Sequence, residues 1–428
     1  MEEGLKREIN TLDVTTNVVN ITIASGIFLL PALIAGILGN SSLYAYFLCG
    51  IVFLLEVLCY AEMSSRYSSS GGASTYIEKA FGGFAGFIAN TIFWFGAGIF
   101  VAAALVNGVA TMLTVTFPVF KDPLWKAALF ICLFSFSTYI NIIGVKSGMK
   151  VVKTFTYIKV VPLILLVLVG FFYVKLDHLH FGAFPGFDKL GEASLILFFA
   201  FTGGETTLNI SGEMKNPNRT APMGLLYGVI AVVLFYCLIQ LISQGVLGDD
   251  LVNHKEAPLA FVAESILGKA GSGVIIVCAV LSIISCFHSV VMVFSRVIFA
   301  GALEGHLPKI FSKVHSSYST PYWSIIAFSV IAFFISISGG FKQLAVLATA
   351  SLLLMHFGVI LSTIRFRLKP DPDFPAKFMI PFGLTIPILA AITIIWFLYQ
   401  LKSNEKIGIL IFIGLLALIY FLRKLKAK

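Results

Sequence analysis

Charged residues are scarce in this chain. Only 12% of its 428 residues are Asp, Glu, Lys or Arg, whereas 58% are hydrophobic, and the mean hydropathy is +0.96. Soluble domains carry about 25% charged residues, so the composition excludes a soluble domain of this length. Long apolar stretches with few charges are typical of a protein that crosses the membrane many times.

Several other signals are also missing. The six cysteines all lie in apolar runs without a Cys-x-x-Cys pair, so we expect neither a disulfide framework nor a metal site. No nucleophile–base pair or phosphate-binding loop is visible, and we therefore expect no enzyme activity and no cofactor. The apolar run 12–38 is too long for a cleavable signal peptide. The net charge of +9 lies at the ends of apolar segments, which favours a role in membrane topology over nucleic-acid binding.

Twelve apolar segments are predicted to span the membrane. They cover residues 14–38, 43–66, 82–116, 126–144, 150–174, 191–210, 222–247, 270–301, 322–338, 341–366, 378–400 and 406–423. The connections on one side hold 20 of the Lys and Arg residues and those on the other side 9, which with one lysine inside a span makes the total of 30. The positive-inside rule then predicts a plasma or inner membrane protein with both termini in the cytoplasm.

The first and sixth of these segments are interrupted. Residues 25–27 break the first and residues 202–205 break the sixth, in both cases with glycine. Hydrocarbon offers no hydrogen-bond partners to the backbone, so a break is expected only where it lines a cavity. Corresponding breaks in two halves indicate a secondary transporter. We therefore predict inverted repeats over 14–174 and 191–366, followed by two further helices over 378–423.

The first break offers groups of both signs. Unwinding would leave free N–H groups on Gly26, Ile27 and Phe28 at the start of the second half-helix, and these favour an anion such as a carboxylate. The carbonyls of Thr22 and Ile23 would face a cation such as an ammonium group. The alternative is that the glycine only allows two helices to pack closely.

The second break contains a charge. A charged side chain at the centre of a span costs about 2.5–3.5 kcal/mol on insertion scales, so Glu205 is expected to have a use. It has three open roles: proton carrier, substrate ligand, or a carboxylate that positions the helix. The carbonyls of Phe199, Ala200 and Phe201 would complete the ammonium site, and the ring of Phe199 would close over the substrate unless it only packs in the core.

One lysine lies inside the fifth span. Lys159 is six residues beyond Lys153, or about 9 Å along a helix. Its ammonium group would either reach back to the membrane interface or tie the fifth span to the broken first helix, where another transporter would hold Na⁺. Glu56, His288 and His356 also lie in apolar segments, and no role is assigned to them.

These motifs resemble those of the amino acid–polyamine–organocation superfamily. The resemblance extends over residues 20–320 and rests on IASGIFLLP at 23–31, FAFTGGE at 199–205 with the loop 213–219, YAE at 60–62 with SGG at 70–72, and the segment 295–308. It implies an all-α membrane protein with a LeuT-type fold of 5+5 inverted repeats. The segment 155–159 resembles helix five of the L-type exchangers and related sodium-independent permeases, which carry a lysine there.

The chain departs from two branches of this superfamily. Arginine/agmatine antiporters hold the guanidinium with an asparagine on helix three and a tryptophan on helix eight. Here the corresponding positions are Ala97 or Ala102, and Val290, which disfavours an arginine or diamine substrate. L-type exchangers that bind a glycoprotein carry a cysteine between spans three and four. The segment 113–126 has none, so no disulfide-linked partner is expected.

The sequence thus predicts a permease for amino acids, with a neutral side chain of modest size favoured. It would work by alternating access in the lipid bilayer, independently of sodium, as an exchanger or a proton symporter, and without nucleic acid. The alternatives are a cationic amino acid or polyamine antiporter that uses Glu205 as charge partner, and an ion channel, since broken helices also build pores.

Two sets of residues are assigned to this function. The predicted substrate-binding residues are Thr22, Ile23, Ser25, Gly26, Ile27, Phe199, Ala200, Thr202 and Gly203, with Asn209 also facing the break. The predicted coupling and gating residues are Lys159, Glu205 and Phe199.

Overall fold

The structure is a computed structural model that describes residues 9–67, 72–143, 149–179, 184–303, 305 and 307–426. These residues are almost entirely helical. Among them, the extended backbone pairs only at one bridge, between Ile9 and Met214. The first break, the second break and the spans around them all lie within the described ranges, whereas the loop motif expected at 70–72 lies largely outside them.

The helices follow one another with short connections. They are α1 (Thr11–Thr22), α2 (Ser25–Leu38), η1 (Gly39–Ser41), α3 (Ser42–Arg66), α4 (Gly72–Phe81), α5 (Gly83–Thr91), η2 (Ile92–Ile99), α6 (Phe100–Leu113), η3 (Pro118–Lys121), α7 (Pro123–Ile143), α8 (Met149–Gly170), η4 (Phe171–Tyr173), η5 (Leu176–His178), α9 (Phe187–Phe201), η6 (Gly204–Glu213), α10 (Pro217–Leu247), η7 (Gly248–Asn253), α11 (Pro258–Leu303), η8 (Lys309–Ser312), α12 (Tyr322–Ser338), α13 (Phe341–Leu368), α14 (Thr385–Tyr399) and α15 (Ser403–Lys426).

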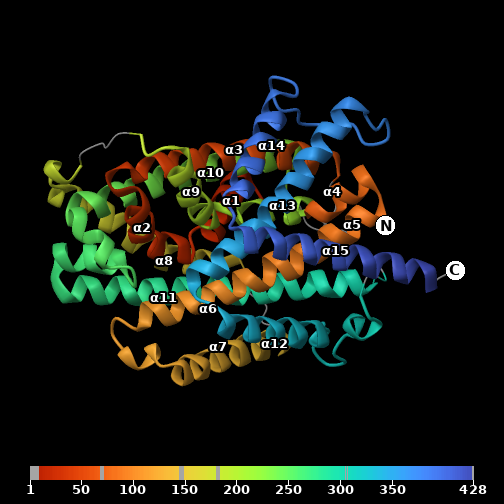
Figure 1. The fold of residues 1–428 in the computed structure, drawn as a ribbon. Helices are drawn as coiled ribbons and strands as arrows, with labels where there is room; N and C mark the ends of the chain where they lie inside the picture. The colour runs from red at the N-terminus through yellow and green to blue at the C-terminus, as the bar shows by residue number, and fades with distance from the viewer. Residues whose placement is uncertain are drawn as a thin grey trace.

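The helices form one bundle (Figure 1). In this view α3 and α10 lie along its upper side, α6, α7, α11 and α12 lie along its lower side, and α1 lies between them. α1 packs against α10 and η6, and α2 packs against α9. Both chain ends are marked on the right of the picture, at the same end of the bundle. The two interrupted segments are therefore surrounded by other helices.

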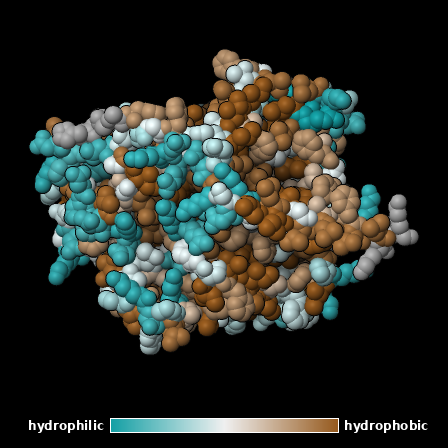
Figure 2. Space-filling model, in the orientation of Figure 1, coloured by the Kyte–Doolittle hydropathy of each residue, from teal (hydrophilic) through white to brown (hydrophobic). Residues whose placement is uncertain are grey.

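The surface of this bundle is that of a multi-pass membrane protein. Seven helical stretches of the described residues are long and apolar enough to cross a membrane, and three shorter apolar helices lie beside them. In Figure 2 hydrophobic residues cover broad areas of the visible face. Only 6% of the apolar window of α15 is buried, so this helix presents its apolar side chains outward, as a lipid-facing helix does. The expected number of twelve spans stays a prediction.

Both interruptions are present. The first span divides into α1 and α2 at Ile23 and Ala24, which have non-helical backbone angles. The sixth divides after α9 at Thr202 and Gly203, where Gly203 has a φ of +110° that favours glycine. Beyond this point the chain continues as the 3₁₀ helix η6 over Gly204–Glu213. Since 3₁₀ runs longer than three or four residues are uncommon, this ten-residue stretch is itself unusual.

Two other spans depart from one continuous α-helix. The third contains a π-helical segment, η2, between α5 and α6. Its i→i+5 pattern shifts the register of the residues that follow relative to an α-helix. In the eighth span, α11 consists of two helices joined at a kink at Gly268, where φ is +68°. The helix after this kink starts close to residue 270, where the span was expected to begin.

The two broken segments touch at glycines. A Cβ atom added to Gly26 of α2 would lie 2.4 Å from the Cβ of Ala200 in α9 and 2.8 Å from its Cα. A Cβ atom added to Gly204 would lie 2.9 Å from Val18 and 3.0 Å from the hydroxyl of Thr22. Any side chain at either position would therefore separate the two breaks. This close approach brings the breaks to one place in the bundle.

A buried ion pair joins the ends of α3 and α13. The guanidinium of Arg367 donates from Nε to both carboxylate oxygens of Glu62, at 2.9 and 3.1 Å, and also donates to the carbonyls of Ile380 and Gly383. The amide of Ile380 donates to Glu62 at 3.1 Å. Neither charged side chain is more than 6% exposed. This cluster holds two spans and the segment before α14 together.

Glu62→Gln should destabilise the protein because it leaves the guanidinium of Arg367 without its charge partner. Removing one member of a buried pair costs about 3–5 kcal/mol. We expect a clear fall in the thermal unfolding midpoint of the purified protein in detergent. The control is Glu192→Gln, whose half-exposed carboxylate lies 3.8 Å from Lys342 and should contribute about 0–1 kcal/mol. Equal midpoints for the two variants would contradict the assignment.

Candidate functional site

The two breaks line a space of about 150 Å³, here called the central cavity. Its walls come from α1, α2, α9 and η6 on the broken segments, and from η2, α6, α8, α11 and α13 around them. An engineered protein cavity of about this volume holds benzene. The central cavity therefore suits a single small molecule rather than a polymer or a large cofactor.

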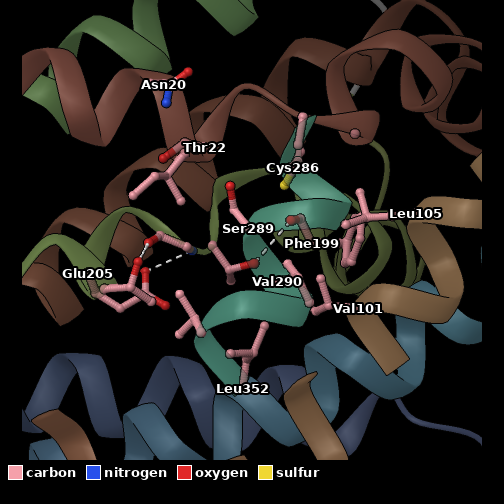
Figure 3. Close-up of a pocket in the computed structure, with 18 of the residues that line it drawn as sticks. Asn20, Thr22, Val101, Leu105, Phe199, Glu205, Cys286, Ser289, Val290 and Leu352 are labelled. Atoms are coloured by element: carbon pink, nitrogen blue, oxygen red, sulfur yellow. Dashed lines mark hydrogen bonds between the residues drawn. The ribbon is translucent and has the colours of Figure 1, made fainter. Parts of the chain in front are cut away.

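The lining of the central cavity is polar on one side and apolar on the other. In Figure 3 Glu205 and Thr22 lie on one side, and Val101 and Leu105 lie across the cavity from them. Val290 and Ser289 project from α11 between the two sides. A molecule with charged groups at one end and an apolar group at the other matches this arrangement.

Most of the residues predicted from the breaks line this cavity. The lining contains Thr22, Gly26, Lys159, Phe199, Ala200, Thr202, Gly203 and Glu205. Ile23, Ser25 and Ile27 are buried in the first break but are not part of the lining. The side chain of Asn209 lies outside the described residues. The geometry thus brings the two halves of the prediction together at one place.

The start of α2 has no side-chain cap. Its N-cap residue is Ala24, whose side chain makes no capping hydrogen bond, so the first N–H groups of α2 lack the usual partner. The adjacent hydroxyl of Ser25 is fully buried and finds no hydrogen-bond partner among the described residues. Gly26 brings this helix end to the cavity wall. The result is a set of unsatisfied donors that an anion would satisfy.

The carbonyl groups of the breaks already have partners. The hydroxyl of Tyr236 in α10 lies 2.9 Å from the carbonyl oxygen of Thr22 and 3.0 Å from that of Ala200, and is a donor shared between both breaks. The hydroxyl of Thr202 donates to the carbonyl of Phe199 at 3.1 Å. A carbonyl oxygen has two lone pairs, so a substrate ammonium would use the second. Tyr236 gave no signal in the sequence, since it is one tyrosine in an apolar run.

Lys159 reaches the first break. Its ammonium group donates to the carbonyl of Ile23 at 3.0 Å and also to that of Asn20. The side chain is only 4% exposed. This geometry matches the tie between the fifth span and the broken helix, and differs from the alternative in which the lysine reaches back to the interface.

Glu205 faces a buried histidine. One carboxylate oxygen accepts a hydrogen bond from the amide of Gly203 at 2.8 Å, and the other lies 3.4 Å from Nε2 of His356 in α13. Nδ1 of the same ring lies 2.6 Å from Glu56 in α3. The sequence marked Glu56 and His356 as buried, but residues 300 positions apart carry no sign of pairing.

The apolar wall was largely missed from the sequence. It consists of Phe93 on η2, Val101 and Leu105 on α6, Val290, Val293 and Phe294 on α11, and Leu352 on α13. Of the third-span positions expected to face the substrate, Ala97 and Ala102 are buried away from the cavity. Val290, the helix-eight position that corresponds to the tryptophan of the antiporters, does line the cavity.

An all-helical membrane protein whose two interrupted spans meet around a central cavity has the architecture of a secondary transporter. The family model described as amino acid permease matches residues 9–424. The chain therefore belongs to the amino acid permease family of the amino acid–polyamine–organocation superfamily. It is an amino acid transporter and not an enzyme.

Curated relatives from Bacillus subtilis (strain 168) match along nearly the whole chain. The serine/threonine exchanger SteT is 29% identical, over 100% of this chain and 99% of its own length. The methylthioribose transporter is 27% identical, over 98% of this chain and 94% of its own. The branched-chain amino acid permease BcaP is 25% identical, over 98% of this chain and 94% of its own length.

Gly26→Ala should reach the membrane but lose both stability and amino acid uptake. Its Cβ would overlap Ala200 at 2.4 Å, and overpacking of this kind costs about 1–3 kcal/mol. Gly26→Val should be more severe, because its larger side chain also blocks the end of α2. The control is Gly36→Ala in the same helix, whose Cβ would meet Val252 at an ordinary 3.5 Å. Heating followed by size-exclusion chromatography measures the stability, and normal uptake by Gly26→Val would contradict the prediction.

Tyr236→Phe should weaken the contact between the two breaks. It removes the hydroxyl that serves the carbonyls of Thr22 and Ala200, and a buried group left unpaired costs about 1–3 kcal/mol. The control, Tyr227→Phe, removes an equivalent hydroxyl from an exposed position on the same helix. We expect a lower unfolding midpoint for Tyr236→Phe alone. Identical midpoints would show that the shared hydroxyl adds nothing.

Proposed function

We propose that this transporter carries small neutral amino acids by alternating access. The observation that carries the proposal is the central cavity, which has unsatisfied N–H donors at one end and an apolar wall at the other. The fold proposed with it is LeuT-type, with twelve spans, inverted repeats over 14–174 and 191–366, two further helices over 378–423, and both termini in the cytoplasm of a plasma or inner membrane protein.

The proposed substrate position follows from the polarity of the cavity. The carboxylate lies at the start of α2, on the N–H groups of Ser25–Phe28, where the helix dipole adds to the hydrogen bonds. The ammonium group takes the free lone pairs of the Thr22 and Ala200 carbonyls. The side chain then points toward Val101 and Val290. The volume of about 150 Å³ supports a side chain of modest size.

Charge supports a neutral substrate over a cationic one. Glu205 is the carboxylate that lines the cavity, and its two oxygens already face the amide of Gly203 and the ring of His356. A cationic side chain would have to compete with both. The names of the relatives also support neutral substrates, since serine, threonine and branched-chain amino acids are neutral.

Two further roles complete the proposal. Lys159 supplies a fixed positive charge at the carbonyls of the first break, and a bound Na⁺ would compete with it for the same oxygens. Phe199 acts as a gate beside the substrate. It lines the cavity, and its ring packs edge-on against Phe341 with the centroids 5.9 Å apart. Transport proceeds by exchange or together with a proton.

Purified protein in liposomes should take up neutral L-amino acids saturably and without sodium. Radiolabelled L-serine and L-leucine are the probes, with L-arginine and putrescine as cationic comparisons. Uptake should be equal in sodium and choline buffers because Lys159 occupies the site that Na⁺ would use. Protein-free liposomes and the D-enantiomers are the controls. Steep sodium dependence would refute the role of Lys159, and a preference for arginine or putrescine would refute the substrate class.

A further inference from the structure

Three buried ionisable side chains form a chain beside the central cavity. Glu56 of α3, His356 of α13 and Glu205 of η6 are 0%, 1% and 6% exposed. The imidazole lies between the carboxylates, with Nδ1 at 2.6 Å from Glu56 and Nε2 at 3.4 Å from Glu205. We call these three residues the Glu–His–Glu triad. Such groups are costly inside a membrane and mark functional positions.

The geometry limits where protons can sit in the triad. The short contact between Nδ1 and Glu56 requires a proton between the two atoms, since two lone pairs would repel. Nε2 has no partner that meets hydrogen-bond geometry, and the nearest acceptor is Glu205. A neutral imidazole has one donor and one acceptor nitrogen. The second contact is therefore the looser one, and a proton at Nε2 or on Glu205 would close it.

A small space lies between the triad and the central cavity. It has a volume of about 20 Å³, and its lining has a polar half, with His356, Glu205, Tyr60 and Thr206, and an apolar half. This volume and these polar neighbours are sufficient for one water molecule. Glu205 and Thr206 line the central cavity as well. Glu205 therefore faces both spaces, and a proton from the central cavity can reach its carboxylate directly.

The other titratable groups near the triad are poor proton carriers. Tyr60 and Cys59 face it from α3, and Tyr76 of α4 lies behind Tyr60. Cys49 of α3 also lies close to Glu56. Phenol and thiol groups hold their protons more tightly than a carboxyl or an imidazolium. Lys159 instead donates to the carbonyls of Asn20 and Ile23 at the first break. This leaves the triad itself as the place where a proton is gained or lost.

We propose that the Glu–His–Glu triad is a proton-binding site that controls the second break. The inference rests on the proposed function and assigns its coupling ion. One proton enters from the central cavity onto the Glu205–His356 pair and reduces the negative charge of the triad by one. No other covalent bond is made or broken.

The link to the break is the hydrogen bond from Gly203 to Glu205. A hydrogen bond to an ionised carboxylate is roughly twice as strong as one to a neutral group. A proton on Glu205 therefore weakens the bond that holds the amide of Gly203. The break is held firmly when the triad is deprotonated and is released when a proton arrives, at the position where the substrate is bound.

Infrared difference spectroscopy of purified protein tests proton binding directly, without a substrate. Acidification should produce the C=O stretch of a buried carboxylic acid. Labelling with carbon-13 glutamate should shift this band without any mutation. Glu205→Gln should abolish the band, and His356→Gln should move its midpoint by at least tenfold in proton concentration. Glu192→Gln, an exposed residue of α9, should leave both unchanged.

Two results would overturn the site: no glutamate band in the labelled wild-type protein, or a band that persists unchanged in Glu205→Gln and in His356→Gln. A transport measurement separates this outcome from failure of the proposed function. Liposomes that contain a pH-sensitive dye should acidify when L-serine enters through the wild-type protein. Serine uptake without acidification would refute the coupling alone. A titrating triad in a protein that transports no neutral amino acid would refute the proposed substrate and leave the proton site intact.

Discussion

The close contact between two broken helices is the constraint on which the rest of this structure depends. A break inside a membrane exposes backbone groups that lipid cannot satisfy. Here the two breaks lie against each other, because Gly26 and Gly204 have no side chains to separate them. The contact shields the exposed backbone from lipid and leaves the central cavity between the broken ends. The proposed substrate site and the stability of the fold therefore depend on the same few atoms.

The backbone groups of the breaks are satisfied by side chains from other spans. Tyr236 of α10 serves a carbonyl in each break, and Lys159 of α8 serves two carbonyls in the first. Glu205 serves an amide in the second, and His356 in turn faces Glu205. Each break is thus fixed by helices that are distant in sequence. A movement of α8, α10 or α13 would therefore displace side chains that contact the breaks beside the cavity.

The sequence predicted the breaks but not their partners. Glycine and a mid-span charge are local features, so residues 25–27 and 202–205 could be found without a structure. The partners depend on how helices face one another across hundreds of residues, and hydrophobic spans show no clear polar face from which to infer this. The role of Tyr236 could not be predicted from the sequence for that reason. The wall formed by Val101 and Leu105 was missed because apolar residues in an apolar span carry no sign of which of them face a cavity.

The two breaks differ in how firmly they are held, and this difference has a consequence for coupling. Lys159 donates hydrogen bonds directly to two carbonyl groups of the first break. The second break depends on Glu205, whose contact with His356 is 3.4 Å long and whose charge can be neutralised by one proton. If the fixed ammonium group excludes Na⁺ from the first break, a proton at the second is the remaining mobile cation that can change the charge beside the substrate. A transporter built in this way would keep one half of its binding site rigid and confine the ion-dependent change to the other half.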